Sequence, residues 1–214
     1  MLDILFVTDY VCPYCLVAKC ALERALELLD VQAQITYQPF ELTPEPRPRV
    51  DTWSDPVRRE KYKILLEPCR ELELPMKLPP RVVPRPYTRL AFEGWFFARE
   101  QGCGDRYNDL VYRAYFLEER DIGNIDVLTD IAAAAGLEPG AFRSALEQGK
   151  YTEQERTACA YAREVLKPTG VPTVYVNGEK ITLRNYSLGE MVSVLKGISG
   201  TEAGGFCCGE EGCG

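Results

Sequence analysis

Cys12 and Cys15 are separated only by Pro13 and Tyr14, in a C-x-x-C pattern. The pattern follows an apolar run at residues 2–7 and opens a segment with helical periodicity. At the start of a helix this spacing places both sulfurs on one face, where unpaired backbone N–H groups and the helix dipole stabilise a thiolate on the first cysteine. These residues predict thiol–disulfide exchange, with Cys12 as the nucleophile and Cys15 as the thiol that resolves the mixed disulfide.

The overall composition narrows the chemistry further. The sequence contains nine cysteines and no histidine. The absence of histidine excludes Ser-His-Asp and Cys-His mechanisms, and it also excludes histidine metal ligands. In a reducing compartment, so many cysteines are more typical of catalysis or metal binding than of structural disulfides.

Length and charge indicate a globular protein. The 214 residues are 46% hydrophobic and 10% aromatic, which is sufficient for a packed core. A net charge of −7 argues against a phosphate-binding surface, so nucleic acid is not an expected partner. We expect a cytoplasmic protein with no membrane contact, because there is no apolar run of about 18 residues and no signal-peptide pattern at the N-terminus.

Three predicted elements position the C-x-x-C. A strand is predicted over residues 2–8, a helix over residues 13–29 with proline in its first turn, and a second strand over residues 31–40. Because a helix-length crossover separates the two strands, we expect them to pair in parallel. Cys12 then lies between the end of the first strand and the start of the helix.

The middle of the chain is predicted to be an all-helical insertion. Prolines are dense at residues 41–56 and 75–86, which indicates loops. Helical periodicity is found at residues 57–73, 88–100, 107–119, 125–135 and 141–147. An aromatic stripe is interpreted as the core of this insertion, and it consists of Trp95, Phe96, Phe97, Tyr112, Tyr115 and Phe116.

The C-terminal part of the chain is predicted to return to the sheet. The expected elements are a helix at 151–167, a strand at 171–176, a hairpin turn at Asn177-Gly178, a strand at 180–183 and a helix at 188–195. The predicted fold class is therefore α/β, with a βαβ unit, a helical insertion and an αββα unit. The predicted boundaries are 1–42 and 150–197 for the two parts of the core, 43–149 for the insertion and 198–214 for a flexible Gly- and Cys-rich tail.

With these features the chain resembles the DsbA-like thioredoxin-fold oxidoreductases, and within them the FrnE-like cytoplasmic branch. The resemblance covers nearly the whole chain. Before the C-x-x-C it rests on Thr8-Asp9. Further along, it rests on the stretch from Arg113-Ala114-Tyr115-Phe116 to Asp121-Ile122, and on Leu128, Ala135-Gly136-Leu137, Gly170-Val171-Pro172-Thr173 and Val176-Asn177-Gly178.

The resemblance implies a thioredoxin-like core in which Cys12 attacks and Cys15 resolves. It also implies a cis peptide bond before Pro172, which packs against the C-x-x-C and leaves the preceding backbone free to pair with a substrate peptide. The candidate substrate-binding residues are Pro13, Tyr14 and Val171. The expected partners are protein or small-molecule thiols and disulfides, with no tightly bound cofactor and with glutathione as the candidate co-substrate.

The chain departs from this family at three places. Tyr14 stands where secreted DsbA proteins have histidine and matches the dipeptide of glutaredoxins, so the strongly oxidising potential of DsbA, about −120 mV, is not expected here. Phe92 stands where the FrnE-like branch has histidine, and residues 181–186 replace a loop of small residues. The last two differences bear on substrate choice.

The other cysteines fall into two groups. Cys207, Cys208 and Cys213 lie in the Gly-rich tail. Cys208 and Cys213 are a candidate second redox pair for exchange with the C-x-x-C, and metal binding by the tail is the alternative. The remaining cysteines are in helical segments and are interpreted as packing residues: Cys20, Cys69, Cys103 and Cys159.

Two other functions fit the same residues. One keeps the fold and uses glutathione in an isomerase or transferase reaction, as kappa-type glutathione transferases and 2-hydroxychromene-2-carboxylate isomerases do, although these usually have serine at the position of Cys12. The other is a metal-binding protein in which Cys12, Cys15 and the tail cysteines hold zinc or a soft metal. Under the redox hypothesis, none of the site residues is a metal ligand.

Overall fold

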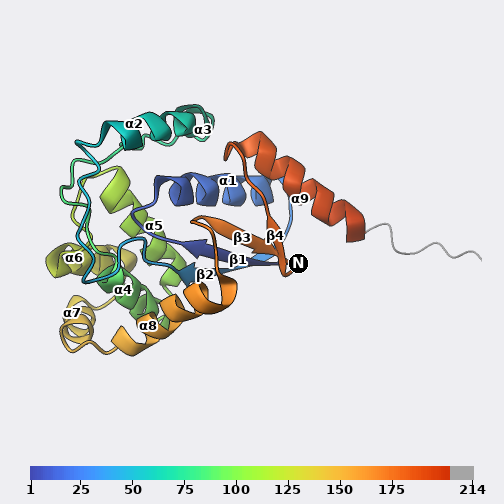
Figure 1. Ribbon diagram of the computed structural model, residues 1–214. Coiled ribbons are helices and arrows are strands. Elements are labelled where there is room, and N and C mark those ends of the chain that lie inside the picture. Colours follow the sequence, from blue (N-terminus) through green and yellow to red (C-terminus); the bar gives the residue numbers. More distant parts are fainter. Residues whose placement is uncertain (203–214) are drawn as a thin grey trace, which may run out of the picture.

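A four-stranded sheet forms the centre of the chain (Figure 1). The computed structural model describes the backbone of residues 1–202 and the side chains of residues 1–198. The strands lie in the order β2-β1-β3-β4, and they are β1 (Leu2–Thr8), β2 (Ala33–Pro39), β3 (Thr173–Val176) and β4 (Glu179–Ile181). β1 is parallel to β2, with Leu2 opposite Ala33, and antiparallel to β3, with Val7 opposite Thr173. The predicted parallel βαβ unit is confirmed.

Helices cover both faces of the sheet. α1 (Pro13–Leu29) and α9 (Leu188–Glu202) pack against each other on one face, and α8 (Thr152–Tyr161) lies on the opposite face beside β2 (Figure 1). α1 begins with Pro13, whose missing N–H would have no helical partner in the first turn in any case. It ends at Asp30, which adopts the left-handed conformation with φ 52°. α1 thus starts one residue after Cys12, close to the end of β1.

The segment between β2 and α8 is helical, as predicted. It contains α2 (Pro56–Tyr62), a 3-10 turn (Lys63–Leu65), α3 (Leu66–Glu71), α4 (Arg89–Glu100), α5 (Gly104–Phe116), α6 (Ile125–Ala135) and α7 (Pro139–Glu147). The predicted α/β class with a helical insertion is confirmed, whereas the exact domain boundaries stay predictions. Within residues 1–202, no helix combines the length and apolar character needed to cross a bilayer.

Two predicted helices differ from the structure. The single helix predicted at residues 57–73 is wrong, because α2 ends at Tyr62 and a 3-10 turn separates it from α3. Pro68 accounts for the break, since it has no N–H to donate to the carbonyl four residues earlier, and the shorter bonds of a 3-10 turn replace the helical ones. The helix predicted at residues 151–167 changes after α8 into a π-helical turn, Ala162–Leu166.

Aromatic side chains fill the insertion, as predicted. All members of the stripe are buried, namely Trp95, Phe96, Phe97, Tyr112, Tyr115 and Phe116. They belong to the same hydrophobic cluster as Ile4 and Phe6 of β1, so the insertion and the sheet share one core. Gly94 of α4 packs so closely that a Cβ there would lie 2.7 Å from the Phe142 ring and closer still to the Tyr107 hydroxyl.

Candidate active site

Cys12 and Cys15 lie at the start of α1. Cys12 is the N-cap residue, with extended backbone angles of φ −93° and ψ 113°. The N–H of Cys15 donates to the carbonyl oxygen of Cys12 at 3.1 Å, which holds both residues in one turn. The Cys12 residue is 4% exposed and lines a surface cleft, whereas Cys15 is fully buried. Both are free thiols in this structure, and a substrate that enters the cleft meets Cys12 first.

A segment from the C-terminal part of the chain completes this site. The Cys12 thiol donates a hydrogen bond to the carbonyl oxygen of Val171, with 3.3 Å between sulfur and oxygen. The peptide bond between Val171 and Pro172 is cis. The pairing of β1 with β3, in which Val7 lies opposite Thr173, places this segment beside the loop before α1. The sheet thereby brings together the two sequence patterns that predicted the site.

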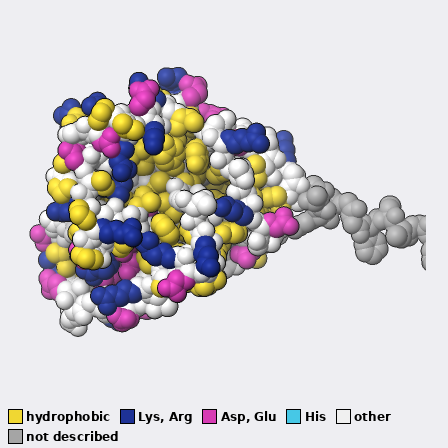
Figure 2. Space-filling model, in the orientation of Figure 1, with side chains coloured by type: hydrophobic (Ala, Val, Ile, Leu, Met, Phe, Trp, Pro, Cys, Tyr) yellow, Lys and Arg dark blue, Asp and Glu magenta, His cyan; other side chains and the backbone are white. Residues whose placement is uncertain are grey.

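A cleft of about 420 Å³ opens beside Cys12. Pro13, Tyr14 and Val171, the candidate substrate-binding residues, all line it. On the face shown in Figure 2, apolar side chains gather over the region of α1 and α2, and Lys and Arg side chains border them. Three cationic side chains line the cleft, those of Arg58, Lys61 and Arg85, together with one anionic side chain, that of Asp55, which pairs with Arg58 at 3.0 Å. An anionic substrate would therefore meet positive charge next to the sulfur.

Tyr14 also connects the C-x-x-C to the insertion. Its hydroxyl donates to the carbonyl oxygen of Lys61 at 3.0 Å, which ties α2 to the start of α1. Its ring lies 6.0 Å from the ring of Tyr62 and 5.3 Å from that of Tyr186, measured between centroids. Burial raises the pKa of the Tyr14 hydroxyl, so this group stays neutral and keeps its proton to donate. The residue thus joins the turn that carries Cys12 and Cys15 to α2 and to the loop after β4.

The Cys15 thiol keeps its proton at neutral pH. Burial raises its pKa well above the ordinary value, and the hydrogen bond and charge of Cys12 raise it further. The hydroxyl of Thr8 opposes this rise through a hydrogen bond, and it shares a second hydrogen bond of 2.5 Å with Tyr112 of α5. Such a thiol does not start an exchange, but it can complete one when a neighbouring thiolate takes its proton.

Asp9 connects the loop between β1 and Cys12 to the segment after β2 through hydrogen bonds. Its carboxylate accepts hydrogen bonds from the N–H of Leu42 at 2.7 Å and from the N–H of Val11 at 3.5 Å. Burial raises the pKa of the Asp9 carboxyl, while these hydrogen bonds and the charge of Arg85 oppose the rise. The carboxyl group therefore holds the loop against the segment that follows β2, which forms one side of the cleft.

The site residues predicted from the sequence do not include the cleft residues Arg58, Lys61, Tyr62 and Arg85. They come from α2 and from the Pro-rich loop before α4, segments that were assigned to the insertion alone. The excess of arginine among the prolines of residues 41–86 was the one signal of a charged surface there. It did not indicate which of these arginines would face the C-x-x-C.

The remaining cysteines differ in their burial and in their contacts. Cys207, Cys208 and Cys213 lie outside the described residues, so the second redox pair stays a prediction. Cys69 is buried as expected for a packing residue, whereas Cys20 and Cys103 are only half-buried. Cys159 is also buried, as expected for a packing residue, but it makes a polar contact as well: its thiol donates a hydrogen bond to the carboxylate of Glu155 at 2.9 Å.

Comparison with known proteins agrees with this fold. A profile of the DSBA-like thioredoxin domain matches residues 3–193. The uncharacterized protein YwbO of Bacillus subtilis is 41% identical over 170 residues, which make up 79% of this chain and 84% of that protein. Among solved structures, a probable DsbA oxidoreductase from Streptomyces coelicolor has a TM-score of 0.75 and 21% identity, over 100% of this chain and 97% of that one.

A second solved structure is that of the cytosolic disulfide reductase DsbM from Pseudomonas aeruginosa. It has a TM-score of 0.68 and 17% identity, over 93% of this chain and 99% of that one. DsbM has also been solved with GSH. Because the profile match extends from β1 through the insertion into α9, the chain belongs to the DSBA-like thioredoxin domain family.

Proposed function

We propose that this protein is a thiol–disulfide oxidoreductase in which Cys12 attacks and Cys15 resolves. The observation that carries the proposal is the position of the Cys12 sulfur. It lies at the N-terminus of α1, in the cleft, 3.3 Å from the carbonyl oxygen of Val171, with the buried Cys15 in the same turn. The similarity in fold to a DsbA oxidoreductase and to a disulfide reductase supports this chemistry.

The proposed reduction of a disulfide proceeds in two exchanges. The Cys12 thiolate attacks one sulfur of the substrate disulfide, which forms a mixed disulfide and releases the other substrate sulfur as a thiolate that takes up a proton. The Cys15 sulfur then attacks Cys12, and the departing second substrate thiolate takes the proton that Cys15 loses. Two electrons pass to the substrate, and a Cys12–Cys15 disulfide remains. The reverse sequence oxidises a dithiol.

The segment before Pro172 is proposed to align the substrate. Val171 borders the cleft and its carbonyl oxygen lies against the Cys12 thiol. An extended peptide beside this segment would pair with its backbone, which places a peptide sulfur near Cys12 without requiring a particular side chain. We therefore propose protein and small-molecule disulfides as substrates, in the cytoplasm, which is the compartment named for DsbM.

An equilibrium titration against glutathione redox buffers tests this function. Each cysteine is mapped by mass spectrometry after alkylation, and we expect Cys12 and Cys15 to change together from two thiols to one disulfide. A midpoint potential above about −200 mV would assign an oxidase or isomerase, and one near about −270 mV would assign a reductase. If no Cys12–Cys15 disulfide forms at any ratio of oxidised to reduced glutathione, the proposed function is wrong.

Glutathione is the proposed small-molecule partner, because the cleft beside Cys12 is lined by Arg58, Lys61 and Arg85. Glutathione carries two carboxylates, which these cations would pair with. Replacing both Arg58 and Lys61 with glutamine is expected to raise the KM for oxidised glutathione about tenfold or more, since hydrogen bonds to charged groups contribute about 1.5–3 kcal/mol. The kcat should change little, because the lost contacts are present in both the ground state and the transition state.

Two controls separate charge recognition from general damage. The uncharged substrate bis(2-hydroxyethyl) disulfide should be turned over equally well by the double variant. Lys63→Gln should leave both substrates unaffected, because Lys63 lies in the adjacent 3-10 turn, is exposed and is paired with Glu60 at 2.6 Å. Equal losses on the charged and uncharged substrates would contradict glutathione recognition by these cations.

A further inference from the structure

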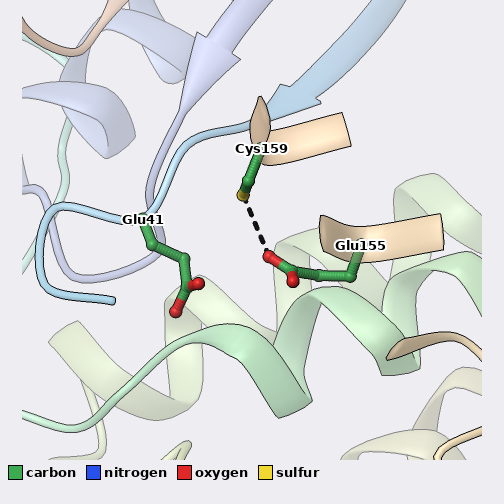
Figure 3. Close-up of side chains that lie close together, drawn as sticks. All are labelled: Glu41, Glu155 and Cys159. Carbon is green, nitrogen blue, oxygen red and sulfur yellow. Dashed lines mark hydrogen bonds between the residues drawn. The ribbon is translucent and has the colours of Figure 1, made fainter. Parts of the chain in front are cut away.

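Three side chains from two distant segments of the chain meet on the side of the sheet covered by α8. Glu41 lies two residues after β2, and Glu155 and Cys159 lie one turn apart on α8 (Figure 3). They are 5%, 1% and 6% exposed, respectively. One ligand atom of each, a carboxylate oxygen or the sulfur, lies within 4.8 Å of the others. Two acids and a thiol therefore share one buried space.

The hydrogen bonds of this cluster leave one acceptor unused. The Cys159 thiol donates to Oε1 of Glu155 at 2.9 Å. Oε2 of Glu41 is buried and has no hydrogen-bond partner within the protein. In Figure 3 the Glu41 carboxyl group turns toward the same space as the Glu155 carboxyl group and the Cys159 sulfur. A buried oxygen without a partner is costly unless a ligand satisfies it.

No basic side chain of residues 1–198 forms an ion pair with either carboxyl group of the cluster. Arg89 instead pairs with Glu93 at 2.5 Å. Arg163 donates to the backbone carbonyl of Glu41 and lies over the ring of Phe40 at 4.7 Å. The cluster thus lacks a directly bound cation.

We propose that Glu41, Glu155 and Cys159 bind one divalent metal ion, with zinc as the ion that their donor atoms favour. A thiolate and two carboxylates suit zinc, whereas calcium and magnesium are bound by oxygen ligands alone. Zinc bonds of about 2.0–2.3 Å hold neighbouring ligand atoms roughly 3.3–3.8 Å apart, so the distances between the three ligand atoms need to shorten by at most roughly 1.5 Å. A cleft of about 300 Å³ lined by these residues gives the ion a path from solvent.

The bound ion would connect the segment that follows β2 to α8. Gln38 of β2 already donates to the carbonyl of Ala158 in α8 at 2.7 Å. The residue after Glu41 is Leu42, whose N–H binds Asp9 and whose side chain lines the cleft beside Cys12. Metal binding would therefore hold the loop before the C-x-x-C in place, as a structural site separate from the thiol exchange itself.

Cobalt, a spectroscopic substitute for zinc, provides the test. The full-length chain is titrated with Co²⁺ in a background that lacks the other candidate thiolate ligands, by serine substitution of Cys12, Cys15, Cys207, Cys208 and Cys213. We expect one ion per chain and a thiolate-to-cobalt charge-transfer band in the near ultraviolet. Adding Cys159→Ser should abolish the band. The matched control Cys69→Ser, which removes another buried helical thiol, should leave it intact.

A second variant covers the case in which Cys159→Ser does not fold. Glu41 lies outside the helices and strands, and Glu41→Gln should weaken Co²⁺ binding about tenfold or more while the band keeps its thiolate character. Zinc should raise the Tm of the background chain and raise that of Glu41→Gln less at equal concentration. The proposal is overturned if the background chain binds no Co²⁺, if the band survives Cys159→Ser, or if Glu41→Gln binds as tightly as the background.

Discussion

Cys12→Ser is expected to abolish disulfide exchange, with a loss of about 1000-fold or more, as is found when a catalytic nucleophile is removed. A serine hydroxyl is not ionised near neutral pH and does not attack a disulfide, whereas every other contact of the site is kept. The measurement is the rate of reduction of a model disulfide by the variant and by the native chain. Because Cys12 occupies the N-cap of α1 and serine is a favourable N-cap residue, the variant should remain folded.

Cys15→Ser separates the two sulfurs by their roles. The variant should still form the mixed disulfide at Cys12 but should not release it, so the complex accumulates and is detected by mass spectrometry without reductant. A glutathione-dependent isomerase, the alternative drawn from sequence, would keep its rearrangement activity when Cys15 is replaced. Full exchange activity in Cys12→Ser, or exchange at the native rate in Cys15→Ser, would contradict the assigned roles.

Gly94→Ala should destabilise the fold by about 2 kcal/mol or more, because a methyl group is forced into a filled core. Its Cβ would lie 2.7 Å from Cζ of Phe142 and still closer to the Tyr107 hydroxyl. Both neighbours are fully buried, so neither can turn toward solvent to make room. Chemical denaturation should show a lower midpoint, and the Tm should fall by about 5 °C for a protein of this size.

Gly197→Ala is the matched control for this prediction. Gly197 also lies within a helix, α9, but a Cβ there meets nothing within 4 Å. The same substitution should therefore stabilise the protein by about 0.5–1 kcal/mol, since alanine loses less conformational entropy than glycine in a helix. If both variants change stability in the same direction, close packing at Gly94 is not the cause.

The N-terminal part of the fold was predictable because its signals are local. The apolar run of β1, the proline at the start of α1 and the spacing of Cys12 and Cys15 all lie within 29 residues, and the structure has this strand and this helix with the predicted bounds. The aromatic stripe was predictable for the same reason, since helical periodicity alone identifies the face that is buried.

The walls of the site depend on contacts that no local pattern describes. Arg58 and Lys61 face the C-x-x-C because Tyr14 binds the backbone of α2, and Glu41 meets Cys159 because α8 packs beside β2. Periodicity identifies which face of a helix is apolar, but it does not specify which other helix or loop that face will meet. The usual burial of free cysteines suggested a packing role for Cys159, whereas one of its polar neighbours, Glu41, lies more than a hundred positions earlier in the chain.

The hydrogen bond between Cys12 and Val171 spans 159 positions of the sequence, and this has a consequence for biosynthesis. At synthesis rates of about 5–20 residues per second, the ribosome adds Val171 roughly 8–30 s after Cys12. During that interval the nascent chain carries Cys12 and Cys15 without the Val171-Pro172 segment that lies against them in the folded chain. No N-terminal fragment that stops before Val171 contains the complete candidate site, so the site is assembled only when nearly the whole chain has been made.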